Sequence, residues 1–353
     1  MLCINGILRQ PHFWFYRHTI KVRFILECVR VKLCNAVFEG GGVRGIGHVG
    51  AACGMEAAGY RFADLVGSSA GAIVAALLAA GYGCRELRQE MERLDYRNLR
   101  GKELMDFFGP VGKALSVVFT LGIYNTDYLE KWLDGLLERK NMRRFSDIKQ
   151  SGRTLKITVS DLTDRKLLIF PEALPSFGLD PGSFPIAKAV RMSVSIPVFF
   201  EPVRLKGKDG RTHLLVDGGL LSNYPMWVLD DGTKALKRPT FGFKFYDAAP
   251  APCKPDPWGS VNLADYLKAL VSTCMDAYDN SHVTKGDYER TIKIPTEVRI
   301  KEGRERKKIN GVDFDITEEE SRALFENGKN AAELFLVRWD FEEWKRRYRS
   351  KSD

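Results

Sequence analysis

The sequence predicts an α/β fold, a three-layer sandwich in which a mainly parallel central sheet is flanked by helices. Short apolar runs typical of strands alternate along the chain with segments of helical periodicity, and this alternation is typical of helices packed on a parallel sheet. Two of the strand-like runs end directly in glycine-containing turns that open helices. The 353 residues, 44% of them hydrophobic, suffice for one large domain with additions or for two domains.

The first predicted elements are two strands, each followed by a helix. Residues 34–39 (CNAVFE) are strand-like and end in a glycine loop, and residues 45–59 follow with apolar side chains at helical spacing. Residues 63–67 (ADLVG) predict a second strand. The stretch after it, SSAGAIVAALLAAGYG, is apolar on all sides, which predicts a helix buried at the centre of the fold with Gly81 at its C-terminal cap.

The later elements continue this alternation. Residues 85–150 are charged and helical in character. Residues 184–200 predict a helix that ends near Pro197, since proline disfavours its continuation. Further strands are expected at four places: 155–162, 166–171, 213–219 and 240–247.

Three regions are expected along the chain. They are a basic N-terminal extension, a central α/β domain and a mainly helical C-terminal part packed on that domain: residues 1–33, 34–245 and 246–353. The rest of the C-terminal part is expected to be helical. Its clearest helix spans residues 315–336, with Asp315 or Thr317 as N-cap and acidic residues in the first turn.

The net charge of +9 is concentrated at the chain ends. Residues 1–33 carry six Lys or Arg against Glu27, and residues 334–353 carry six against four acids, so the body between them is nearly neutral. Basic, aromatic-rich ends suit peripheral contact with an anionic membrane surface, above all through the N-terminal extension. Basic patches alone also fit nucleic acid or an ordinary solvated surface, and we assign no nucleic-acid partner.

Neither a membrane span nor an export signal is predicted. No run of about 18 uncharged apolar residues occurs, and Arg17, Lys21 and Arg23 interrupt the apolar N-terminal stretch. The seven cysteines show no C-x-x-C pair and no Cys/His metal spacing, which favours buried free thiols in a reducing compartment. We therefore expect a cytoplasmic protein.

Two apolar stretches have alternative interpretations. Residues 107–124, which glycines and Pro110 interrupt, fit either a mobile cap over a substrate site or core packing. The C-terminal region has apolar residues at helical steps: Leu334, Val337, Phe341, Trp344 and Tyr348. Such a stripe faces the core more often than a membrane.

The second predicted strand leads into a serine between glycines, G-x-S-x-G, at Gly67, Ser69 and Gly71. A serine on a tight strand-to-helix turn has strained backbone angles, and glycines two residues away let the chain pass closely. The turn places Ser69 at the N-terminus of the buried helix, whose dipole favours developing negative charge. The motif alone is weak, but the strand before it and the apolar helix after it are the context of a nucleophilic serine.

A serine nucleophile needs a base, and Asp217 is the preferred candidate. It ends an apolar strand, and Gly218 and Gly219 let the chain turn sharply around it. A carboxylate can take the serine proton directly when partial desolvation raises its proton affinity. D-G-G is also the ordinary composition of a turn, so this motif alone leaves both interpretations open.

The histidines are weaker candidates for the base. A triad in the chain order Ser–Asp–His leaves only His282, whose polar surroundings (YDNSHVTKGD) indicate a surface histidine. His48 lies in the first turn of a predicted helix and His213 opens a predicted strand, so structural roles are favoured for both.

The glycine loop supplies what acyl transfer needs beside a nucleophile. Negative charge builds on a carbonyl oxygen, and backbone N–H groups must point at it. Gly40, Gly41 and Gly42 offer unhindered N–H donors between a strand and a helix N-terminus, and Arg44 adds positive charge or braces the loop. The dinucleotide fingerprint G-x-G-x-x-G also fits this loop, but it needs an acid at the end of the second strand, and Asp64 begins that strand.

Together these three blocks resemble the patatin-like phospholipases. That family has a G-G-G-x-R/K-G oxyanion loop, a G-x-S-x-G serine and a D-G-[GA] aspartate in this order, here GGGVRG ending at Gly45, GSSAG (67–71) and DGG (217–219). The resemblance covers about residues 35–245 and includes NYP (223–225). The chain departs mildly from the family's A-S/A-x-A-x-P pattern, with SVSIP at residues 193–197.

The resemblance implies a cofactor-independent lipid acyl hydrolase with a Ser–Asp dyad and neither metal nor calcium. Ser69 would attack the ester, Asp217 would take and return the proton, and the glycine loop would hold the oxyanion. The substrate is expected to be a phospholipid or related lipid. The alternatives are a short-chain carboxylesterase or acylglycerol lipase, and a nucleotide- or lipid-binding module without turnover.

Overall fold

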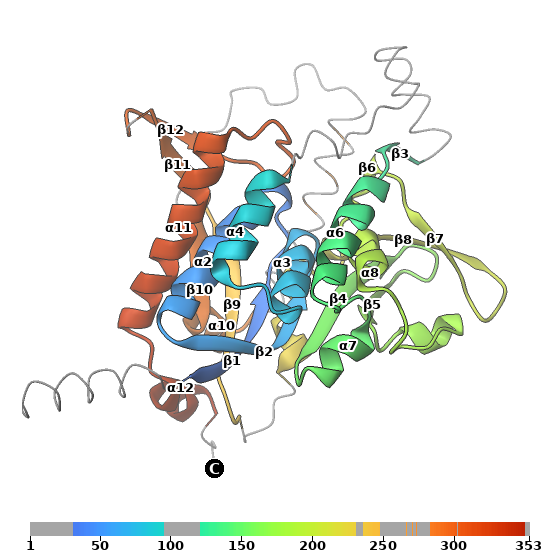
Figure 1. The fold of residues 1–353 in the computed structure, drawn as a ribbon, viewed down its shortest axis with the longest axis horizontal. Coiled ribbons are helices and arrows are strands. Elements are labelled where there is room, and N and C mark those ends of the chain that lie inside the picture. Colours follow the sequence, from blue (N-terminus) through green and yellow to red (C-terminus); the bar gives the residue numbers. More distant parts are fainter. Residues whose placement is uncertain are drawn as a thin grey trace, which may run out of the picture.

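The fold is built on a mixed eight-stranded sheet, seen in a computed structural model of the chain (Figure 1). The structure describes residues 31–94, 121–230, 236–247, 266, 270, 273, 283–301 and 303–349. The strands are β1 (Lys32–Phe38), β2 (Tyr60–Gly67), β4 (Thr154–Asp161), β5 (Lys166–Phe170), β7 (Val203–Lys206), β8 (Thr212–Asp217), β9 (Thr240–Tyr246) and β10 (Thr291–Pro295). Their order is β10-β9-β1-β2-β4-β8-β7, and β5 pairs with β4.

Most of this sheet is parallel. The strands from β10 through β9, β1 and β2 to β4 pair in parallel, whereas β8 and β5 pair antiparallel with β4, and β7 antiparallel with β8. Two small two-stranded sheets pair β3 (Gly122–Tyr124) with β6 (Val198–Phe200), and β11 (Glu297–Ile300) with β12 (Glu305–Lys308). The predicted α/β class with a mainly parallel sheet is confirmed.

Helices flank the sheet (Figure 1). They are α2 (Gly45–Ala57), α3 (Ala70–Ala79), α4 (Cys84–Arg93), α6 (Asp127–Arg139), α7 (Phe145–Gln150), α8 (Ile186–Ser193), α10 (Lys285–Glu289), α11 (Glu318–Val337) and α12 (Phe341–Tyr348). Every residue of α3 is buried, as its all-apolar sequence predicts. Val37 and Val66 belong to a second, smaller apolar cluster, in which they pack against Tyr224 and Met226. Met226 lies in the short helix η6 (Met226–Leu229).

The helix α11 packs on α2 at very short range. A Cβ atom at Gly50 of α2 would overlap the carbonyl oxygen of Phe325, and one at Gly328 of α11 would overlap the carbonyl oxygen of Gly47. Glycine therefore lets the two backbones touch. Because α2 follows the glycine loop directly, the C-terminal region supports the part of the chain that carries this loop.

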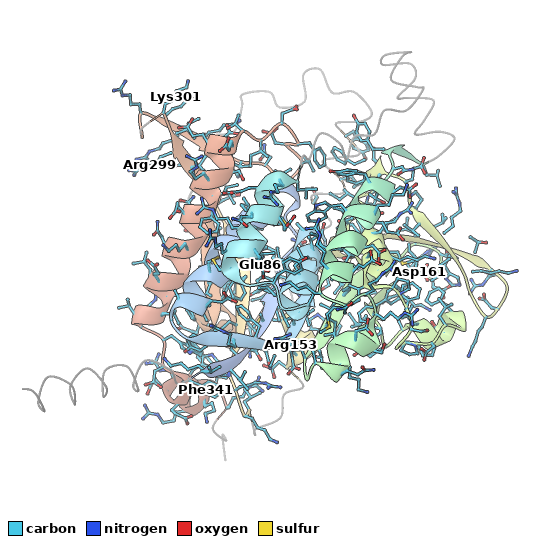
Figure 2. The ribbon with its side chains drawn as sticks, in the orientation of Figure 1. Glu86, Arg153, Asp161, Arg299, Lys301 and Phe341 are labelled. Carbon is cyan, nitrogen blue, oxygen red and sulfur yellow. A yellow bond between two sulfur atoms is a disulfide. The ribbon has the colours of Figure 1, made fainter. Side chains whose placement is uncertain are left out.

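Two expectations about the elements were wrong. The helix predicted to end near Pro197 ends four residues earlier, at Ser193, because a proline ring clashes with the helical carbonyl group four residues before it, and residues 198–200 form strand β6. The C-terminal region is not helical throughout: β10 extends the main sheet, and β11 and β12 form a hairpin. Figure 2 shows Arg299 and Lys301 at this hairpin, away from the body of the molecule. Thr317 is confirmed as the N-cap of α11.

The predicted C-terminal stripe does not form one face of one helix. The chain breaks between α11 and α12, so its members separate. Val337 is 87% exposed, whereas Trp344 is buried. Among the described residues, no helix has the length and apolar character that a membrane crossing requires. Residues 1–30 and 95–120, which include most of the predicted extension and cap, lie outside the described residues.

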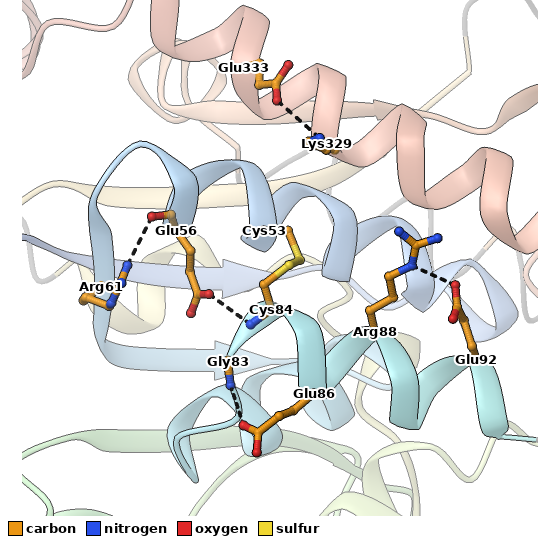
Figure 3. The surroundings of a disulfide bond; sticks show 10 residues. All are labelled: Cys53, Glu56, Arg61, Gly83, Cys84, Glu86, Arg88, Glu92, Lys329 and Glu333. Carbon is orange, nitrogen blue, oxygen red and sulfur yellow. Dashed lines mark hydrogen bonds and ion pairs between the residues drawn. A yellow bond between two sulfur atoms is a disulfide. The ribbon is translucent and has the colours of Figure 1, made fainter. Parts of the chain in front are cut away.

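The expectation of free thiols was wrong for one pair of cysteines. Cys53 of α2 and Cys84 at the start of α4 form a disulfide, with their Cα atoms 5.0 Å apart (Figure 3). The backbone N–H of Cys84 also donates to Glu56 Oε2 at 3.0 Å, so the same two helices are joined twice. The cysteines are 31 residues apart and no spacing rule marks such a pair. Of the other cysteines, Cys34 lies in the described ranges and is free and buried.

Candidate active site

Ser69 lies at the turn between β2 and α3, as the sequence predicts. Its φ of 51° and ψ of −126° place a non-glycine residue in a strained region of the backbone map. The flanking glycines are required by space: a Cβ at Gly67 would overlap the backbone of Gly71, and one at Gly71 would overlap the carbonyl oxygen of Phe38. The turn therefore fixes Ser69 tightly between β2 and the buried helix.

The strand register brings Asp217 to this turn. Ile157 of β4 pairs with Gly67 of β2 and also with β5, and Val159 pairs with Asp217 of β8 and also with β5. Because β5 takes one edge of β4 at both positions, β2 and β8 share the other edge. β2 runs parallel to β4 and ends opposite Ile157. β8 runs antiparallel to β4 and ends opposite Val159, two residues further along β4. The ends of β2 and β8 therefore face each other along β4.

Ser69 and Asp217 form a buried hydrogen-bonded pair. The Oγ of Ser69 donates to Oδ2 of Asp217 at 2.5 Å, and the N–H of Gly219 donates to Oδ1 of the same carboxylate at 2.7 Å. Asp217 is fully buried and Ser69 is 3% exposed. A Cβ at Gly218 would overlap the carbonyl oxygen of Thr158 in β4, so the D-G-G turn lies directly against β4. The structure thus brings together the serine and the aspartate that the sequence singled out.

Burial changes the acidity of this carboxyl group. Removal from water raises the pKa of Asp217 from its ordinary value of 3.8 to about 7, against the opposing effect of the hydrogen bonds from Ser69 and Gly219. A carboxylate with such a pKa holds a proton far more readily than an exposed aspartate does. It can therefore accept and release a proton near neutral pH without a histidine.

The backbone amides of the glycine loop divide into engaged and open ones. The N–H of Gly40 donates to the carbonyl oxygen of Asn223 at 3.0 Å, and that of Val43 donates to Gly311 at 2.9 Å. Within the described part of the chain, the N–H groups of Gly41 and Gly42 have no hydrogen-bond partner. Gly41 and Gly42 are therefore the donors left for an oxyanion.

Arg44 orients one of these donors. Its Nε donates to the carbonyl oxygen of Gly41 at 3.2 Å, and its guanidinium lies over the ring of Phe245, 4.7 Å from the centroid. The C=O of Gly41 and the N–H of Gly42 belong to one planar trans peptide and point in opposite directions. Holding the carbonyl therefore turns the Gly42 N–H away from Arg44. This geometry favours the bracing role of Arg44.

Close packing fixes the loop in this conformation. Gly42 has a φ of +56°, and a Cβ there would overlap the carbonyl oxygen of Gly311. A Cβ at Gly41 would overlap the ring of Phe245, and one at Gly40 would overlap the amide of Asn223. At Gly45 a Cβ would make only an ordinary contact, 3.4 Å from the Cβ of Ala70. Three of the predicted glycines are thus sterically required.

A small apolar cavity of about 40 Å³ adjoins the serine. Gly42 and Ser69 line it together with apolar side chains, among them Ile73, Leu129 and Phe314. Gly42, Ser69 and an apolar wall therefore border the same space. Such a space suits the reacting end of an apolar ester.

The histidines are engaged elsewhere. Nδ1 of His213 lies 2.8 Å from Oδ2 of Asp161, and Nε2 of His48 lies 2.8 Å from the carbonyl oxygen of Glu39. Burial lowers the pKa of His48 to about 3, so this side chain is neutral at physiological pH. His282 lies outside the described residues.

One cluster within the described ranges has the composition of a metal site: Asp161, Asp164 and His213. Its carboxylates already have partners, because Asp164 pairs with Lys166 and Arg211 while Asp161 accepts from the N–H of Thr163 and faces the His213 ring. These cations neutralise the charge that a divalent ion would require. The cluster fits a structural role.

Several residues that hold this site in place were not predicted from the sequence. Ser193 accepts the backbone N–H of Ser69 at 2.9 Å, and Asn223 holds Gly40. Gly311 and Phe314 come from a segment almost a hundred residues beyond Asp217. No motif marks that segment, and only the folded chain brings it to the glycine loop.

Sequence and structure comparisons relate this chain to several known proteins. A family model described as patatin-like phospholipase matches residues 36–230. An uncharacterized protein of Bacillus subtilis, YqhO, is 37% identical over 87% of this chain and 99% of its own length. The probable lipid hydrolase 463L of Invertebrate iridescent virus 6 is 24% identical over 54% of this chain and 61% of its own. The crystal structure of VipD from Legionella pneumophila aligns with a TM-score of 0.49 and 16% identity, covering 86% of this chain and 66% of VipD.

Proposed function

Because this chain belongs to the patatin-like phospholipase family, we propose that it is a lipid acyl hydrolase in which Ser69 and Asp217 form the catalytic dyad. The observation that carries the proposal is the hydrogen bond between these two buried side chains, beside two open backbone amides. The proposed substrates are the carboxylic esters of phospholipids or related lipids.

In the proposed acylation step, Asp217 takes the proton of Ser69 as Oγ attacks the ester carbonyl. The carbonyl oxygen becomes negatively charged and accepts hydrogen bonds from Gly41 and Gly42, aided by the dipole at the N-terminus of α3. The tetrahedral intermediate collapses, the ester C–O bond breaks, and Asp217 gives its proton to the departing alcohol. Ser69 is left acylated.

Deacylation repeats these roles with water. Asp217 takes a proton from a water molecule, whose oxygen attacks the acyl carbonyl while Gly41 and Gly42 again hold the oxyanion. The bond to Oγ then breaks, Asp217 returns the proton to Ser69, and the fatty acid leaves. Both half-reactions need Asp217 to start as the carboxylate, and its raised pKa supports this use because the protonated form is then a stable intermediate.

The size of the cavity at Ser69 favours a second candidate, a short-chain carboxylesterase or acylglycerol lipase. About 40 Å³ admits only a few atoms in the described conformation. We prefer a lipid substrate because the family and the probable lipid hydrolase among the relatives support it. The proposed contact with an anionic membrane surface rests on the charge of residues 1–33, and a cytoplasmic location likewise stays a prediction from the sequence.

A fluorophosphonate probe tests the nucleophile, because it labels only an activated serine. We expect the wild type and Ser68→Ala to be labelled and Ser69→Ala to remain unlabelled. Ser68 is a matched control: it is adjacent and buried, and its Oγ has no hydrogen-bond partner in the described structure. Wild-type protein that neither reacts with the probe nor releases fatty acid from phospholipid vesicles would point to a binding module instead.

A further inference from the structure

A second and larger hollow begins beside the cavity at Ser69. It is a cleft of about 700 Å³ between the end of α4 and the chain that leads into α11. The cavity at Ser69 has a volume of about 40 Å³, room for about three water molecules. Leu94 and Phe314 line both spaces. These two side chains are therefore the partition between the serine and the cleft.

Phe314 is held firmly in the partition. It is 8% exposed, and its ring centroid lies 5.9 Å from that of Phe200 and 6.3 Å from that of Phe199. The segment that carries it is fixed on one side by the hydrogen bond from the Val43 N–H to Gly311 and on the other by the N-cap of α11 at Thr317. The position of Phe314 relative to the glycine loop is thus set by the backbone.

The cleft has an apolar floor and a polar rim. Met91 and Leu94 from the α4 side are buried, Phe314 is buried, and Ile316 is half-buried. The polar residues around the cleft, such as Glu92 and Glu318, are exposed. An apolar chain lying along this floor would be removed from water, which stabilises it by an amount that grows with each methylene.

We propose that the acyl chain of the substrate passes from Ser69 between Leu94 and Phe314 into the cleft, and that Phe314 determines which chain lengths are accepted. This inference rests on the proposed acyl hydrolase function of Ser69. A chain of a few carbons fits the cavity as it stands. A longer chain must displace the side chains of the partition, so its rate depends on how much space they leave. Phe314 lies outside the region matched by the family model.

Chain-length profiles of Phe314 variants test whether this side chain controls the passage of the acyl chain into the cleft, a role that we call the gate. The ratio of kcat/KM for p-nitrophenyl palmitate to that for p-nitrophenyl butyrate, both in the same detergent, is compared between proteins. We expect the ratio to rise about tenfold in Phe314→Ala, which joins the two spaces, and to fall about tenfold in Phe314→Trp, which narrows the passage. Val312→Ala is the matched control, because Val312 belongs to the same segment but is exposed and lines neither of the two spaces. Its ratio should stay within about twofold of wild type.

The outcomes separate the gate from the proposed function. If wild type and variants cleave both esters with the same ratio, the gate is wrong while the hydrolase stands. If the wild type cleaves neither ester and its Ser69 does not react with the fluorophosphonate, the proposed function itself fails. Thermal melting checks each variant, and Phe314→Leu, which also frees space, replaces Phe314→Ala if the latter does not fold. A ratio in Phe314→Leu equal to wild type would then overturn the gate.

Discussion

The Oγ of Ser69 lies 2.5 Å from the Oδ2 of Asp217, although 148 residues separate them along the chain. Two strands that end head to head on one edge of β4 create this contact. The contact does not depend on flexible segments, because both residues lie at sterically restricted turns. The pair is therefore part of the rigid sheet edge, and its chemistry is set by burial.

The pH dependence of turnover is expected to report the Asp217 carboxyl group. Its pKa of about 7 means that this carboxyl group is mostly protonated below neutral pH and ionised above it. We expect kcat/KM for p-nitrophenyl butyrate to rise with pH and level off, with an apparent pKa of about 7. Asp217→Asn should lower kcat by at least about a hundredfold at every pH.

His213→Ala serves as the control for this profile. His213 lies on the same strand as Asp217, but its ring faces Asp161 and makes no hydrogen bond to the described dyad residues. Its removal should leave the shape of the profile unchanged. A wild-type profile that levels off below pH 5, or one that loses its inflection in His213→Ala, would contradict the assignment of Asp217 as base.

The same burial predicts that Asp217 lowers the stability of the folded protein above neutral pH. The unfolded chain ionises this carboxyl near its ordinary value of 3.8, whereas the folded protein holds its proton to about 7. Between these values the folded state binds more protons, so the contribution of Asp217 to the free energy of unfolding falls as pH rises through this window. Above pH 7 the folded protein contains a buried, ionised carboxylate, and this is the destabilising form.

Asp217→Asn removes this charge and tests the sign. We expect its melting temperature to exceed that of wild type at pH 8, and the difference to shrink as the pH is lowered towards 4. Asp209→Asn is the control, because Asp209 lies on an exposed turn where hydrogen bonds from Arg211 lower its pKa. It should give no gain at pH 8. A melting temperature of Asp217→Asn below that of wild type at pH 8 would show that the ionised carboxylate stabilises the fold.

Gly311→Ala is expected to impair the oxyanion loop from outside it. The added Cβ would lie 2.7 Å from the carbonyl oxygen of Gly41, the same oxygen to which Arg44 donates. The Gly41–Gly42 peptide must then shift, and with it the N–H that is proposed to hold the oxyanion. Loss of one such donor typically costs about a hundredfold or more in kcat, so we expect a fall of about ten- to a hundredfold for this displacement.

Gly135→Ala is the matched control for this change. Gly135 lies within α6, and a Cβ there would meet nothing within 4 Å. Alanine in a helix interior is more favourable than glycine, so this variant should melt no lower than wild type and keep its kcat. A value of kcat in Gly311→Ala equal to that of Gly135→Ala would show that the C-terminal segment does not position the loop.

The strands and turns that carry Ser69 and Asp217 could be predicted from the sequence because their signals are local. Gly67, Ser69 and Gly71 lie within five residues, and D-G-G follows an apolar strand, so steric need and chemistry are visible together. The support of these turns is not local. The disulfide between Cys53 and Cys84 and the contact of Gly42 with Gly311 depend on how helices and loops pack, and no periodicity or spacing encodes that packing. Strands β10 to β12 were not predicted because, unlike the equally short β5 (KLLIF), none of them contains a continuous apolar run.

Ser193 is the residue whose removal tests how the strained turn is held. Its Oγ accepts the backbone N–H of Ser69 at 2.9 Å, in a fully buried position at the end of α8. Ser193→Ala leaves this N–H without its partner, which costs about 1–3 kcal/mol in stability and relaxes a backbone with a φ of 51°. We expect kcat to fall about tenfold with little change in KM, because Oγ of Ser69 moves relative to Asp217 while the cavity keeps its walls.

Two further variants distinguish this positioning role from a general loss of packing. Ser193→Thr retains the hydroxyl and should restore most of kcat. Ser195→Ala removes a neighbouring buried hydroxyl that donates to the carbonyl oxygen of Arg191 and leaves the backbone of Ser69 untouched. It should therefore destabilise the protein without the fall in kcat. Equal values of kcat in Ser193→Ala and Ser195→Ala, measured on folded protein, would mean that the β2–α3 turn keeps Ser69 in place without help from α8.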